Sequence, residues 1–215
     1  MTGTRRLSIL IPGLIPALIL AAAGGAVAPA RAAILEPDPG CKKPVVSSQA
    51  VYPREPVAYT LEKHPQFKSA GKPLGLFQAR ETIGYRIEIQ GGCLKSLAVK
   101  ITAQPSIFLR SIYKKKTRKC ARKSVLSHER GHGRIAKKLY RALAARIKKT
   151  AVKLFTGKKV PDVKTAGTAL DAMMKADVIP GFQKRYDAAQ KGFHTKIAQA
   201  DIIRKNCKLV KRKRY

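Results

Sequence analysis

Acidic residues are scarce in this sequence of 215 residues: 12 Asp and Glu stand against 45 Lys and Arg. Loss of the first 32 residues, with Arg5, Arg6 and Arg31, would leave 45 − 3 = 42 basic residues and a formal charge of 42 − 12 = +30. A field of this strength attracts polyanions of any kind, including nucleic acid, lipopolysaccharide and acidic wall polymers. We therefore expect non-specific polyanion binding, whatever the principal function of the chain.

Charged residues are absent from the apolar stretch between Leu7 and about Val27. Arg5 and Arg6 precede this stretch, and the small-residue segment 28–32 (APARA) follows it. Basic, apolar and small segments in this order predict a secretory signal peptide over residues 1–32, removed after Ala30 or Ala32. Prolines and glycines interrupt the stretch, which disfavours a permanent transmembrane anchor.

The predicted mature chain, residues 33–215, has the length of a single domain, and it ends in a basic tail that includes residues 211–214. We expect a periplasmic or secreted protein with no stable membrane span after cleavage. Its four cysteines include no Cys-x-x-Cys pair, which disfavours a cysteine zinc site. An even number of cysteines in an exported chain predicts two disulfides, in any of three pairings, among Cys41, Cys93, Cys120 and Cys207.

Two kinds of hydrophobic periodicity predict an α+β fold. Apolar residues alternate with polar ones over 83–89 and again over 97–103, on either side of Gly91-Gly92, which predicts a hairpin in a small antiparallel sheet. The period then changes to three or four residues over about 122–154, which predicts one long helix. Shorter helices are expected over about 168–178 and 182–205, separated by Pro180-Gly181.

The long helix carries the pattern His-Glu-x-x-His, in which His128 and His132 lie one turn apart. Residues with this spacing share one helix face, so both imidazoles can reach a single zinc ion while Glu129 projects beside them. In such a site the metal activates a water molecule and the carboxylate accepts its proton. The sequence therefore predicts a Zn²⁺ cofactor, with Glu129 as the catalytic base.

The third metal ligand is less directly indicated. The extended pattern HExxHxxGxxH is absent, because Ile135 and Lys138 occupy its later positions, and no glutamate follows Glu129. His194 is our candidate, because it is the only later histidine and lies beside the apolar stripe of the last helix. An aspartate remains an alternative, with these candidates: Asp171, Asp177, Asp187 and Asp201. His64, before a proline in a loop, is interpreted as structural or exposed.

These motifs resemble a family of bacterial predicted secreted zinc-dependent proteases, known mainly from its HExxH motif. The resemblance covers about residues 75–200 and rests on three segments: Ile83-Gly84-Tyr85-Arg86-Ile87 with Gly92-Cys93, Leu126 to His132 with Ile135-Ala136, and Tyr186-Asp187 followed by His194. It implies a zincin-like fold, with a C-terminal helical part that closes the cleft, and it supports His194 as the third ligand. Tryptophan, common in the strands of that family, is absent here.

The function expected from these features is hydrolysis of peptide bonds by a periplasmic or secreted zinc metallopeptidase. Its substrate would be a protein or peptide, and an amide in a cell-wall peptide is one candidate because such polymers are anionic and lie near the export route. Two alternatives remain. One is a non-catalytic basic envelope protein that binds cell-wall polymer, lipopolysaccharide or nucleic acid, and the other is a structural envelope protein with an inactive site.

Overall fold

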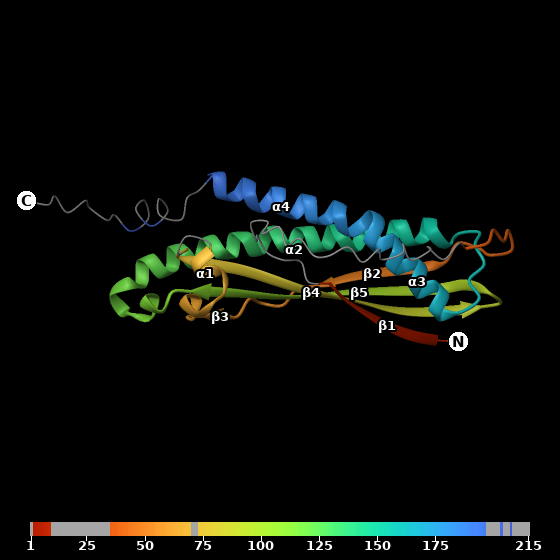
Figure 1. Cartoon of the computed structure of the whole chain (residues 1–215), viewed down its shortest axis with the longest axis horizontal. Coiled ribbons are helices and arrows are strands. Elements are labelled where there is room, and N and C mark those ends of the chain that lie inside the picture. The colour runs from red at the N-terminus through yellow and green to blue at the C-terminus, as the bar shows by residue number, and fades with distance from the viewer. Residues whose placement is uncertain (1, 10–34, 70–72, 197–202, 204–206, 208–215) are drawn as a thin grey trace, which may run out of the picture. The chain divides into compact units, whose positions relative to one another are not determined.

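The computed structural model describes residues 2–9, 35–69 and 73–196, together with Ile203 and Cys207 (Figure 1). Most of the predicted signal peptide, the basic tail at 211–214 and Asp201 lie outside the described residues. Residues 2–9 form strand β1 (Thr2–Ile9), which pairs antiparallel with strand β4 (Gly75–Gln90). Removal of the leader stays a prediction.

The chain forms two compact units, to which β4, strand β5 (Cys93–Leu109) and the long helix α2 (Lys119–Phe155) each contribute residues. We call Met1–Tyr52, Arg80–Ala103 and Lys138–Arg185 the hairpin unit, and Pro53–Ala79, Gln104–Lys137 and Tyr186–Tyr215 the histidine unit. Both units combine strands and helices, which confirms the α+β class. Nothing in the structure tests the prediction of a single domain over 33–215, so it stays a prediction.

The sheet differs from the predicted antiparallel one. Strand β2 (Val45–Val51) pairs parallel with β5 (Cys93–Leu109), and so does the short strand β3 (Val57–Ala58). The antiparallel prediction was wrong for these strands because alternation identifies a strand but not its distant partner.

Strands β4 and β5 are neighbours in the sheet and are joined by Gly91 and Gly92 (Figure 1). Both glycines have positive φ, 58° and 73°, a conformation that side chains disfavour and that two-residue turns require. Both strands are longer than predicted. Pro105 interrupts the alternation in the sequence, yet β5 continues to Leu109, and buried and exposed residues alternate along it.

Helix α2 (Lys119–Phe155) buries the predicted face, including Val125, Leu143 and Ile147. Helix α3 (Val163–Met173) starts at Asp162, whose side chain accepts a hydrogen bond from the Thr165 backbone, and it passes through a π-helical turn, η4 (Met174–Val178), into α4 (Ile179–Lys196).

The predicted break at Pro180 is wrong. Pro180 lies in the first turn of α4, after a wider π turn, where the loss of one backbone N–H has little cost. None of the described helices is both long enough and apolar enough to cross a membrane.

Each unit contains one disulfide, which confirms the prediction of two. Cys41 bonds to Cys93 in the hairpin unit, and Cys120 bonds to Cys207 in the histidine unit. In the latter, Ile203 joins a buried cluster with Ile107, Leu109 and Val125, so β5 and α2 share this part of the core.

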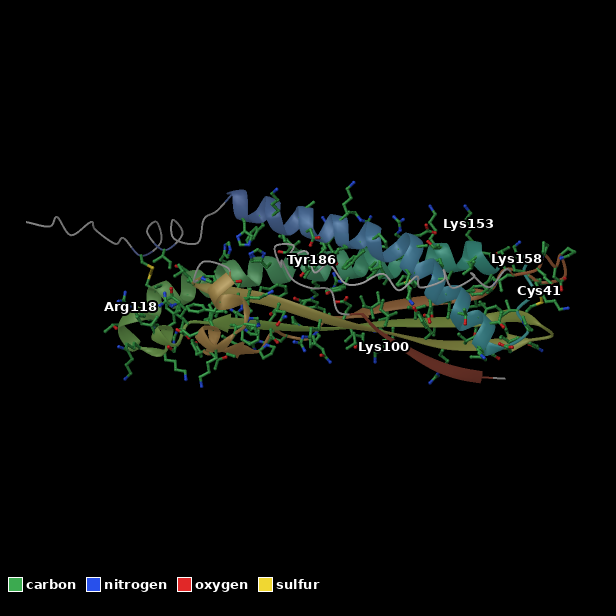
Figure 2. All side chains as sticks on the ribbon, viewed as in Figure 1. Cys41, Lys100, Arg118, Lys153, Lys158 and Tyr186 are labelled. Atoms are coloured by element: carbon green, nitrogen blue, oxygen red, sulfur yellow. A yellow bond between two sulfur atoms is a disulfide. The ribbon has the colours of Figure 1, made fainter. Side chains whose placement is uncertain are left out.

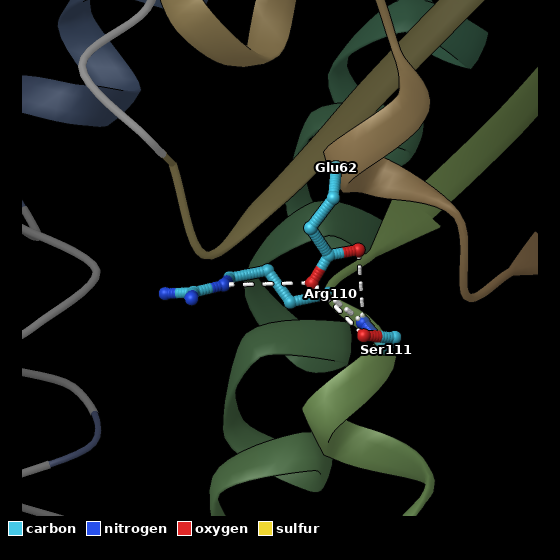
Figure 3. Close-up of polar contacts among 3 residues, drawn as sticks. All are labelled: Glu62, Arg110 and Ser111. Carbon is cyan, nitrogen blue, oxygen red and sulfur yellow. Dashed lines mark hydrogen bonds and ion pairs between the residues drawn. The ribbon is translucent and has the colours of Figure 1, made fainter.

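The histidine unit also contains four short helical elements: η1 (Leu61–Lys63), α1 (Gln66–Ser69), η2 (Ser111–Lys114) and η3 (Lys116–Arg118). A polar contact joins η1 to η2. The carboxylate of Glu62 accepts hydrogen bonds from the backbone N–H of Ser111, at 2.9 and 3.1 Å, and from its hydroxyl at 3.1 Å (Figure 3). Arg110 lies 3.8 Å from the same carboxylate. The carboxylate thus satisfies the first donor of η2.

Candidate metal centre

His128 and His132 face each other from successive turns of α2. Their exposed fractions are 3% and 4%, and their Nε2 atoms lie 3.2 Å apart. Two nitrogens bound to one zinc at ~2.0–2.1 Å and at a tetrahedral angle would lie ~3.3 Å apart. The observed separation therefore suits two ligands of one ion.

Helix α4 brings His194 to this pair. Its ring centroid lies 4.5 Å from that of His132 and 5.5 Å from that of His128. One ligand atom from each of the three histidines lies within 4.8 Å of the others, so the group could hold a metal ion. The side chain of His194 is exposed, in contrast to the other two.

The described aspartates among the alternative ligands, Asp171, Asp177 and Asp187, are not part of this group. Among the described residues, Asp187 does not join the three histidines, although it lies on the same helix as His194. Asp171 and Asp177 belong to the hairpin unit. Of the candidates for a third ligand, the structure therefore brings His194 to the pair.

A phenyl ring covers the two buried imidazoles. Phe193 stacks on His128 at 4.9 Å between ring centroids and meets His132 edge-on at 4.7 Å. This position depends on Gly131, because a Cβ there would overlap the Cζ of Phe193 and lie 3.0 Å from its Cε1. Nothing in the sequence pairs Gly131 with Phe193.

Gln190 is hydrogen-bonded to the imidazole of His132. Its Oε1 is hydrogen-bonded to Nδ1 of His132, and its side chain is only 5% exposed. An amide oxygen only accepts, so Nδ1 carries the proton and Nε2 keeps a free lone pair toward the other histidines. Gln190 was missed in the sequence, although its position one turn before His194 was the available signal. Within the described part of the chain, Nδ1 of His128 has no hydrogen-bond partner.

Glu129 is enclosed by the start of β4. The side chain is 1% exposed, and a Cβ at Gly75 would lie 2.7 Å from its Oε1. Burial raises the pKa of Glu129 to about 8, although a hydrogen bond from the Phe77 backbone opposes this rise. A cation bound nearby would lower this pKa and favour the ionised carboxylate.

The histidines carry the charge state that metal binding needs. Burial lowers the pKa of both His128 and His132 to about 4, and a charged His194 nearby lowers it further. Burial also lowers the pKa of His194. Neutral imidazoles are the metal-binding form, and three of them suit ions of the zinc, copper, iron or nickel type.

Asp38, Cys41 and Cys93 also lie close enough together to be considered as metal ligands. The two sulfurs are bonded to each other at 2.04 Å, so no thiolate is available. His64 fits its structural interpretation, because its Nδ1 accepts from the Gln66 backbone and its ring lies 4.7 Å from that of Phe108.

Comparisons with protein-family models, with curated proteins and with solved structures gave no match to this chain. The resemblance to secreted zinc-dependent proteases therefore stays a prediction, and so does the zincin-like fold.

Proposed function

We propose that this chain is a zinc-dependent metallopeptidase in which His128, His132 and His194 hold one Zn²⁺ and Glu129 is the general base. The observation that supports this most directly is the convergence of three neutral imidazoles beside a buried carboxyl group. When bound, zinc would supply Lewis acidity that activates a water molecule and polarises the scissile carbonyl.

In this proposal the protein's own groups prepare the site before the substrate arrives. Gln190 fixes the tautomer of His132, and Phe193 keeps water from the faces of the buried imidazoles. Phe77 donates a backbone hydrogen bond to Glu129, which orients its carboxylate. Glu129 would accept a proton from water and deliver it to the leaving amine, and a pKa raised toward neutrality suits both steps.

The substrate class is a peptide bond, and a cell-wall peptide remains a candidate because the chain is strongly basic. Two disulfides are compatible with a compartment outside the cytoplasm, which accords with a periplasmic or secreted enzyme.

Metal content tests the first half of this proposal. We expect one zinc per chain in the purified, oxidised protein by elemental analysis, and its loss in H128A and H132A. H194A should bind zinc more weakly. H64A is the matched control, because His64 belongs to the same unit but not to the cluster, and it should retain the metal. Oxidised protein without bound zinc after zinc loading would refute the proposal.

Peptide cleavage tests the second half. E129Q should keep its zinc but lose cleavage of a peptide library by at least about 10²-fold, the range for removal of a general base. Equal cleavage by wild type and E129Q would show that Glu129 is not the base.

A second candidate is a non-catalytic envelope protein that uses the metal for stability. The enclosure of Glu129 favours it, because a carboxylate that is 1% exposed and packed against Gly75 has little room for water. This candidate predicts that zinc raises the melting temperature of wild type and E129Q equally, with no peptide cleavage by either.

A further inference from the structure

A cavity of about 1250 Å³ lies in the hairpin unit, along the last turns of α2 and against α3 and η4. On α2 it is lined at Arg146, Lys149, Thr150 and Lys153, positions three or four residues apart that share one helix face. We call this cavity the basic groove. All its lining residues belong to the hairpin unit, so it does not depend on the metal centre.

The charges of the basic groove are unbalanced. Its lining contains two carboxylates, Asp171 and Asp177, and five cationic groups: Arg146, Lys149, Lys153, Lys158 and Lys175. The difference, 5 − 2, leaves a formal charge of +3. Figure 2 labels Lys153 and Lys158 at this end of α2.

These cations have no carboxylate partner. Across the described parts of the chain, ion pairs join Lys95 to Glu88 and Arg110 to Glu62, and none involves a residue of the basic groove. Arg146 donates instead to the backbone oxygen of Asp177, at 3.4 Å. Several ammonium groups around one cavity repel one another, so an anion bound among them is favoured.

Apart from the two threonines Thr150 and Thr168, the rest of the lining is aliphatic. Ala169 and Met173 are buried beneath the groove, and Leu154, Ala172 and Ala176 complete its apolar part. No aromatic residue lines it, so the groove offers no platform on which a nucleic-acid base could stack. Exposed cations above an aliphatic floor instead match a ligand with an anionic end and an aliphatic part.

We propose that the basic groove binds an anionic lipid at a membrane surface, with the headgroup among Lys149, Lys153 and Lys175 and the aliphatic part against Met173 and Ala172. This would hold the protein at an anionic lipid surface without a membrane-spanning helix. The proposal is independent of the proposed peptidase, since it uses no residue of the metal centre.

Vesicle co-sedimentation tests the proposal with the full-length chain. Wild type should bind phosphatidylglycerol-containing vesicles and leave pure phosphatidylcholine vesicles unbound. The triple variant K149Q/K153Q/K175Q should bind about a hundredfold more weakly, because each basic residue at an anionic surface contributes about fivefold.

The matched control is K115Q/K116Q/K119Q, which removes the same charge from exposed lysines of the histidine unit. It should weaken vesicle binding by less than about fivefold. Equal losses in the two triple variants would overturn the proposal, because net charge alone would then explain binding. The proposal would also be overturned, in favour of nucleic acid, if K149Q/K153Q/K175Q lost binding to a DNA oligonucleotide while its vesicle binding was unchanged.

A second variant tests the aliphatic floor. Ala176 is exposed, so A176N should fold normally, yet its amide would lose water when lipid enters the groove. We expect vesicle binding to weaken about tenfold while binding of soluble glycerol phosphate is unchanged. If A176N leaves vesicle binding unchanged, the lipid makes no apolar contact in the groove, and the proposal is overturned.

Discussion

Each unit of the molecule buries one glutamate, and the two carboxyl groups have different surroundings. Glu129 lies beside histidines in the histidine unit, whereas Glu81, 4% exposed in the hairpin unit, accepts a hydrogen bond from the Tyr140 hydroxyl at 2.9 Å. Burial raises the pKa of Glu81 to about 7, a rise that the Tyr140 bond opposes. Both units thus contain a carboxyl group with a raised pKa, and the neighbouring imidazoles distinguish Glu129 from Glu81.

The units also differ in how their disulfides close the chain. Cys120 and Cys207 are 87 residues apart and hold Ile203 near the start of α2, whereas Cys41 and Cys93 are 52 apart. By the chain-entropy relation, loss of the longer link should cost about 4.6 kcal/mol of unfolding free energy and loss of the shorter one about 4.1 kcal/mol.

We therefore expect C120S/C207S to lower the denaturant midpoint most strongly, and to weaken zinc binding as well. C41S/C93S should destabilise the protein while zinc bound to the folded form is retained. Calorimetric zinc titration of both variants below their unfolding temperature measures this difference, and equal loss of zinc would remove the distinction between the units.

Glu81 provides a pH test in the hairpin unit. Its pKa is about 7 when folded, against 4.5 for the ordinary side chain, so the folded protein binds more protons than the unfolded chain between these values. This contribution to stability is complete below about pH 4.5 and is lost as pH rises to 7, by about 3 kcal/mol. E81Q should remove that slope.

Chemical denaturation of wild type and E81Q at several pH values between 4 and 8 gives the measurement. The difference between their unfolding free energies matters, because other groups titrate equally in both proteins. A difference that does not change with pH would show that Glu81 is ionised at neutral pH in the folded protein.

Two glycines test the close packing around the metal centre. By helix propensity alone, G131A and G192A should each stabilise the protein by about 1 kcal/mol. A Cβ at Gly192 meets no atom within 4 Å, whereas one at Gly131 overlaps the ring of Phe193. We therefore expect G192A to stabilise and G131A to destabilise by about 2 kcal/mol, as overpacking does. Thermal unfolding would contradict this if both variants changed in the same direction.

The smallest expected effect is on zinc affinity. It concerns a difference between the two buried histidines, because Gln190 is hydrogen-bonded to His132 and not to His128. Q190L should weaken zinc affinity about tenfold, because outer partners fix ligand tautomers. Nitrogen NMR should then show a changed tautomer at His132 and an unchanged one at His128. Q49L, at an exposed position of β2, is the control and should leave both unchanged. An unaltered His132 spectrum in Q190L would rule out this positioning role.

Local pattern sufficed where neighbours in sequence decide the outcome. The three-to-four-residue period predicted α2 and its inward face with His128 and His132, and alternation predicted the central parts of β4 and β5. Helices and half-buried strands are short-range structures, so their apolar spacing is visible in one segment. The even number of cysteines predicted two disulfides but not their pairing.

The sequence by itself therefore determined the helix that carries His128, Glu129 and His132, the strands and the excess of positive charge. Tertiary structure decided the parallel pairing of β2 and β3, the continuity of α3 through η4 into α4 past Pro180, and the cysteine partners. It also brought three residues of α4, His194, Gln190 and Phe193, into contact with His128 and His132. These partners are 58 to 66 residues apart in the sequence, from 190 − 132 = 58 and 194 − 128 = 66. These contacts depend on side-chain volume and hydrogen bonding between distant segments, which no local period encodes.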